Sequence, residues 1–158
     1  MSAPIWESAL VAALVASAVS LTTLWWNSRQ SRLDRQRKLF AEAYAAVAEY
    51  REFPFIIRRR DSTGMDRSTI HRDLSRVQVA LHRYEAMLRV EAPTVAAAYA
   101  RLVAETRRIA GAEISKAWDL PAAADDGDMH VADVDLSPLD SHESAFLAAT
   151  RNQFSRWS

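Results

Sequence analysis

Residues 70–88, IHRDLSRVQVALHRYEAML, contain the most regular helical pattern of this chain. Apolar side chains recur there at alternating spacings of four and three, at Ile70, Leu74, Val77, Leu81, Tyr84 and Leu88. That spacing places them on one helix face, as in a coiled-coil seam. The opposite face carries Arg72, Arg76 and Arg83. The stretch therefore predicts an amphipathic helix that ends before Pro93.

Helical periodicity also extends to both sides of this stretch. Residues 39–53 carry a broad apolar face, and Pro54 is expected to end or kink that helix. A helix is expected from Pro93 to about Trp118, antiparallel to the preceding one because almost no loop separates them. Leu81 is expected to be buried between these neighbours.

The last helix is expected to begin at Ser137-Pro138-Leu139-Asp140, with Ser137 as its cap and proline in the first turn. No segment alternates with period two, so no strand is expected. The sequence predicts an all-α fold, with about four amphipathic helices packed as an antiparallel bundle over residues 39–158.

Two connecting segments of this bundle carry concentrated charge. Residues 119–136 hold six Asp and no Lys or Arg, which indicates an exposed acidic loop. The connector 54–67 contains Arg58, Arg59 and Arg60. These three arginines are expected either to be solvated in a turn or to dock onto the acidic loop or an acidic partner.

The N-terminal residues 5–26, IWESALVAALVASAVSLTTLWW, have a different composition. Residues 8–26 contain no charge, Pro or Gly, and as a helix they would be roughly 28 Å long, close to the thickness of a bilayer core. Residues 1–26 are therefore predicted to be a transmembrane anchor. A cleaved signal peptide and a buried helix of a soluble domain are the alternatives, although residues 1–7 lack the basic leader of a signal peptide.

Residues 27–38 follow the apolar stretch as a predicted basic juxtamembrane stalk. The residues expected at the membrane interface are Trp6, Trp25, Trp26, Arg29, Arg32, Arg35, Arg37 and Lys38. Positive residues remain on the cytoplasmic side, so the prediction is a single-pass inner-membrane protein with its N-terminus outside and its bundle in the cytoplasm. Membrane lipid is accordingly an expected partner.

Small residues recur every four positions within the apolar stretch, at Ser8, Ala12, Ala16 and Ser20. In lipid, such a row allows two helix backbones to approach closely. It predicts self-association or pairing with another membrane helix, although the abundance of Ala alone also accounts for it.

Composition and motifs exclude several functional classes. The net charge is +0 and there is no Cys, which argues against nucleic-acid binding and excludes thiol chemistry and Cys-ligated zinc. None of the four His residues, at 71, 82, 130 and 142, has an acid three residues before it, as a di-iron bundle requires. No phosphate-binding loop or nucleophile elbow is present. We expect no enzymatic activity and no metal or other cofactor.

These observations predict a non-enzymatic membrane protein whose helical domain holds a protein partner, or a second copy of itself, at the inner membrane face. The alternative is a bacterial or phage-encoded regulatory or defence component whose helices sense a ligand or a partner.

Overall fold

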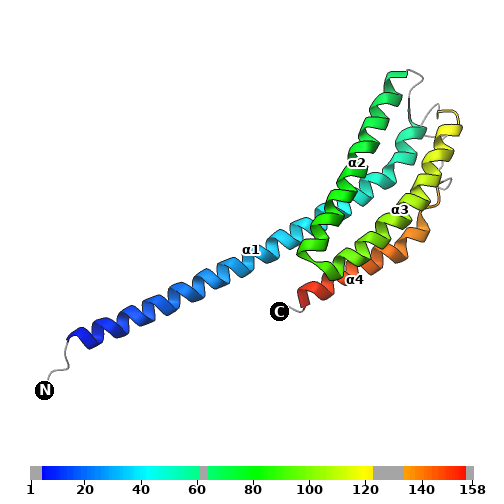
Figure 1. Cartoon of the computed structure of the whole chain (residues 1–158). Coiled ribbons are helices and arrows are strands. Elements are labelled where there is room, and N and C mark those ends of the chain that lie inside the picture. The colour runs from blue at the N-terminus through cyan, green and yellow to red at the C-terminus, as the bar shows by residue number, and fades with distance from the viewer. Residues whose placement is uncertain (1–4, 61–63, 123–133, 156–158) are drawn as a thin grey trace. The chain divides into compact units, whose positions relative to one another are not determined.

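The computed structural model describes residues 5–60, 64–122 and 134–155, with side chains described at 17, 19–60, 67–122 and 134–155. The elements in this part of the chain are all helical: α1 (Ile5–Arg58), α2 (Gly64–Glu91), α3 (Pro93–Asp119), the 3₁₀ turn η3 (Ser137–Leu139) and α4 (Asp140–Ser155) (Figure 1). The predicted all-α fold is confirmed. The chain divides into two compact units, Met1–Arg37 and Lys38–Ser158.

The prediction of a membrane-spanning helix is corrected by this structure. Within the described residues, no helix is long and apolar enough to cross a membrane. For the described residues, the predicted single-pass localisation at the inner membrane is therefore wrong. Trp6, Ser8, Ala12 and Ala16 lie outside the described side chains.

The first helix also continues further than the sequence predicts. Pro54 lies inside α1, which ends only at Arg58. Proline in a helix interior costs about 3 kcal/mol because it removes a backbone donor. Phe53 and Ile57 flank it with exposed fractions of 2% and 0%. Burying two such side chains contributes about 1.5–3 kcal/mol each, enough to offset the proline.

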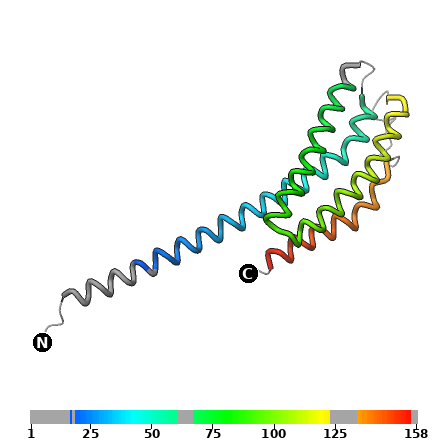
Figure 2. The backbone as a smooth tube through the Cα atoms, in the orientation of Figure 1, coloured from blue at the N-terminus to red at the C-terminus, as the bar shows by residue number. Residues whose placement is uncertain are grey.

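The seam of α2 forms the centre of the core in the second unit, as predicted. Val77, Leu81 and Leu88 are completely buried. Ala92 is the single residue between α2 and α3, and its amide donates to the carbonyl of Leu88 at 2.8 Å. Figure 2 shows the chain turning directly from one helix into the other, which confirms the predicted antiparallel pair.

Aromatic side chains connect α1 and α3 with α4. Phe146 of α4 lies between Tyr44 of α1 and Tyr99 of α3, at ring-centroid distances of 6.3 and 5.6 Å. Phe40 and Phe154 make a further contact at 5.5 Å. These rings close the side of the core that α4 covers.

Two tyrosine hydroxyls and one carboxylate anchor the same interface. The buried Tyr99 hydroxyl donates to the carbonyl of Ala43 at 3.2 Å, and burial raises the pKa of Tyr99. Glu143 of α4 accepts a hydrogen bond from the Tyr44 hydroxyl at 2.8 Å and forms an ion pair with Arg51. The hydrogen bond to Glu143 raises the pKa of Tyr44. Both partners of Glu143 therefore tie α4 to α1.

The last helical segment begins where predicted, with η3 leading into α4, but Ser137 lies inside η3 and does not cap it. One carboxylate oxygen of Asp135 accepts from the Ser137 amide at 3.0 Å and from the Ser137 hydroxyl at 2.6 Å. Both bonds lower the pKa of Asp135. Asp135 is therefore the acceptor that fixes the turn just before η3, and Ser137 is the donor to it.

Candidate interaction surface

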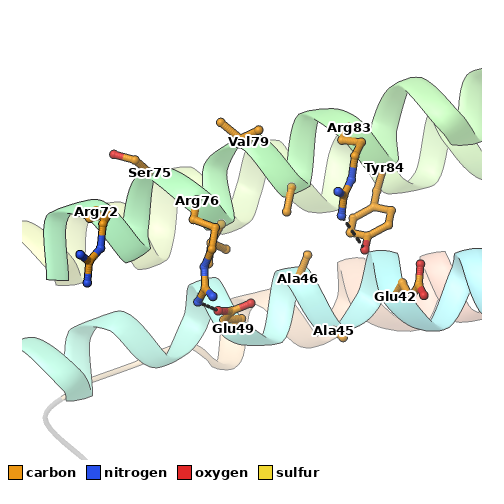
Figure 3. Close-up of a pocket in the computed structure, with 12 residues that line it drawn as sticks. Glu42, Ala45, Ala46, Glu49, Arg72, Ser75, Arg76, Val79, Arg83 and Tyr84 are labelled. Carbon is orange, nitrogen blue, oxygen red and sulfur yellow. Dashed lines mark hydrogen bonds and ion pairs between the residues drawn. The ribbon is translucent and has the colours of Figure 1, made fainter. Parts of the chain in front are cut away.

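An open groove of about 630 Å³ lies between α1 and α2 in the second unit (Figure 3). Its lining includes the small side chains of Ala45 and Ala46 of α1 and Ala80 of α2, beside Val77 and Tyr84. Where two helices face each other through alanine, the side chains do not fill the space between the backbones. The groove is thus a consequence of small residues at the facing positions.

The two walls of the groove carry opposite charges. Glu42 and Glu49 belong to α1, and Arg72, Arg76 and Arg83 belong to α2 (Figure 3). The α1 wall is therefore acidic and the α2 wall is basic.

One ion pair crosses the groove. The guanidinium of Arg76 lies 2.7 Å from the carboxylate of Glu49, and their side chains are 67% and 48% exposed. An exposed pair of this kind contributes about 0–1 kcal/mol. Arg83 instead donates to the hydroxyl of Tyr84 at 3.0 Å and lies over its ring. The charges of this surface contribute little to the stability of the fold.

An apolar side chain stands at the centre of the basic wall. Val79 lines the groove and is 68% exposed. It belongs to a second stripe of α2 with the same alternating spacing as the core seam, formed by Arg72, Arg76, Val79, Arg83, Ala86 and Val90. The face opposite the core seam is therefore built of arginine and small apolar residues.

The predicted arginine run lies at the distal end of α1 and contacts the end of α3. Arg60 donates to the carbonyls of Ala117 at 2.9 Å and Leu120 at 2.6 Å, and its guanidinium lies 5.2 Å from the Trp118 ring centre. Arg58 donates to the carbonyl of Pro121 at 2.9 Å. The last carbonyls of a helix lack partners within it, so Arg60 caps α3. Binding of an external acidic partner by Arg58, Arg59 and Arg60 stays a prediction.

The residues predicted to lie at a membrane surface belong to the N-terminal part of α1. Trp25 and Trp26 are 59% and 55% exposed, and the Arg29 guanidinium lies 5.5 Å from the Trp25 ring centre. The remaining members of the set with exposed side chains are Arg32, Arg35, Arg37 and Lys38. Arg37 pairs with Asp34 at 3.2 Å. Ser20, the one described member of the small-residue row, is exposed.

His71 and His82 contact different side chains. His71 stacks on Trp118 at 5.2 Å, and Arg107 donates to Nε2 of His82 at 3.0 Å. His130 lies outside the described residues. In the part of the chain that is described, no three His, Asp or Glu side chains are grouped so as to hold a metal ion.

Comparisons of the chain with models of protein families, with curated proteins and with solved structures find no match. Function must therefore be inferred from the surface itself. Sequence reasoning placed the three arginines of the basic wall on the face of α2 opposite the core, without assigning them a binding role. It missed Glu42 and Glu49 as the opposite wall, because only the pairing of α1 with α2 brings them alongside.

Proposed function

We propose that this chain is a non-enzymatic protein-interaction module that binds its partner in the α1–α2 groove. The observation that carries the proposal is the groove itself. Alanines separate two walls of opposite charge at Glu42 and Glu49 and at Arg76 and Arg83. A bound helix or strand would cover the exposed Val79 and contact both walls. Removing such an exposed apolar side chain from water favours association.

Site-specific photocrosslinking tests this proposal. A benzoylphenylalanine is introduced into the full chain at Ser75, which lines the groove, and separately at Ser144 on an exposed face of α4. Irradiation in the cells that naturally make the chain should give a discrete protein adduct from position 75 and none from position 144. Absence of any adduct from position 75, or equal adducts from both positions, would contradict the proposal.

The alternative of a regulatory or defence component stays a prediction from the sequence. It names a biological process rather than a binding mode, and a partner captured in the groove would identify that process.

A further inference from the structure

We infer that the groove binds the same groove of a second copy of this chain, so that two chains form a dimer about a two-fold axis. This inference rests on the proposed interaction function and names its partner. The argument depends on the order of charges along the two walls.

The two helices that line the groove run in opposite directions. The Arg76–Glu49 ion pair places the middle of α2 beside Glu49. Glu42, one end of the acidic wall, lies beside Tyr84 and therefore near Arg83 (Figure 3). From one end of the groove to the other, Glu42 is thus alongside Arg83, and Glu49 is alongside Arg76.

A two-fold axis parallel to the groove converts this arrangement into complementarity. Rotation by 180° places the acidic wall of the second copy over the basic wall of the first, and the basic wall over the acidic one, as an isologous interface requires. Glu42 of the second copy then faces Arg83, and Glu49 of the second copy faces Arg76.

The spacing of the charges agrees with this register. Glu42 and Glu49 are seven residues apart, as are Arg76 and Arg83, so both pairs span about 10.5 Å along their helices. This rotation keeps each residue at the same position along the groove, so both charge pairs align at once, with the rotated α1 antiparallel to the α2 that it covers. One rotation about a single axis therefore creates four opposite-charge contacts per dimer.

The floor and the rim of the groove favour the same occupant. Ala45, Ala46 and Ala80 project little, which permits close approach of a second helix pair, and Val79 would become covered in each copy. A uniformly acidic or uniformly basic partner would place like charges against one of the two walls, which costs affinity. A second copy carries both signs in the required order.

Charge reversal on the full chain provides the test. One variant is Glu42→Arg/Glu49→Arg, which makes both walls basic, and the other is Arg76→Glu/Arg83→Glu, which makes both walls acidic. Sedimentation velocity should show a dimer for the wild type. For each variant alone, the dissociation constant of the dimer should rise by about a hundredfold or more. An equimolar mixture of the two variants should restore the dimer as a heterodimer.

The matched control is Arg101→Glu, an exposed charge reversal on α3, which should leave the dimer unchanged. Circular dichroism establishes that each variant is folded. A monomeric wild type, variants that still dimerise alone, or a mixture that does not associate would each overturn the inference.

The photocrosslinking result separates failure of this inference from failure of the interaction function. An adduct from position 75 with twice the mass of the chain supports the dimer. An adduct of another mass overturns the dimer and leaves the interaction module standing, whereas no adduct overturns both.

Discussion

Helix α1 has two kinds of neighbour, and the side chains fill the space differently on the two sides: on one side lie α3 and α4, and on the other lies α2. Where α1 meets α4, Phe40 packs against Phe154 and Tyr44 stacks on Phe146, which also contacts Tyr99 of α3. Where α1 meets α2 on the outer side, alanines face each other and a groove of about 630 Å³ remains. Both sides have helical periodicity, so side-chain volume at the facing positions separates a closed core from an open surface.

The difference between the two sides also concerns the use of charge. On the closed side, the Glu143 side chain is 13% exposed and holds both Arg51 and Tyr44. On the open side, Glu49 and Arg76 pair across water-accessible space. The same type of ion pair should therefore stabilise the fold on one side and contribute little on the other. Removing similar side chains from the closed and the open side should therefore change the free energy of unfolding by different amounts.

The largest expected difference lies between two apolar residues of α2. Leu81→Ala should reduce the free energy of unfolding by about 2–5 kcal/mol, because Leu81 is 0% exposed and its truncation leaves a cavity. Val79→Ala, two residues away and 68% exposed, should change it by less than about 0.5 kcal/mol. Urea denaturation, followed by circular dichroism at the lowest practical protein concentration, measures both values.

Comparable losses for these two variants would mean that the groove face is buried within the single chain. The division into a closed and an open side would then be wrong, as would the surface assigned to partner binding.

A smaller difference is expected between the two carboxylates. Glu143→Ala should cost about 1–3 kcal/mol, because it leaves the half-buried Arg51 and Tyr44 without their shared acceptor. Glu49→Ala should cost at most about 1 kcal/mol, because the pair that it removes is exposed. The same denaturation experiment compares them, and a larger loss for Glu49→Ala would reverse the assignment of the two sides.

Much of the closed side was predictable because large apolar residues at helical spacing have few alternatives to burial. The seam of α2 around Leu81 and the face of α3 around Tyr99 are the clearest cases. The helix does not end at Pro54, because a local backbone rule was outweighed by burial of Ile57 one turn later. That burial depends on packing against other helices, which periodicity within one segment does not reveal.

The groove could not be predicted, because alanine is compatible with both a core and a surface position. Nothing in the sequence indicates that Ala46 and Ala80, 34 positions apart in the chain, line one groove. The same is true of Glu143, whose partner Arg51 is 92 residues away. Long-range pairing of small or charged residues therefore determined the candidate site, whereas local apolar patterns determined the bundle.

The smallest expected effect lies at the edge of the closed side, where the chain enters α4. Asp135 holds Ser137 in place, directly beside the buried Leu136 and Leu139. Because its two bonds lower the pKa of Asp135 in the folded chain, its contribution to stability is present above the pKa of an unfolded Asp, about 4. That contribution is lost as the pH falls further, through the lowered folded pKa. Asp135→Ala should therefore melt slightly below the wild type at neutral pH, and the two melting temperatures should converge under acidic conditions.

Asp135→Asn is the matched control for this prediction, because an amide oxygen can still accept from Ser137 but does not titrate. The difference in melting temperature between Asp135→Asn and Asp135→Ala should therefore stay constant with pH, while that between wild type and Asp135→Ala declines below about pH 4. Melting followed by circular dichroism across this range measures both differences. If the gap between wild type and Asp135→Ala were unchanged in acid, the ionised carboxylate would not be what secures the start of α4. The closed side would then depend at this edge only on burial of Leu136 and Leu139.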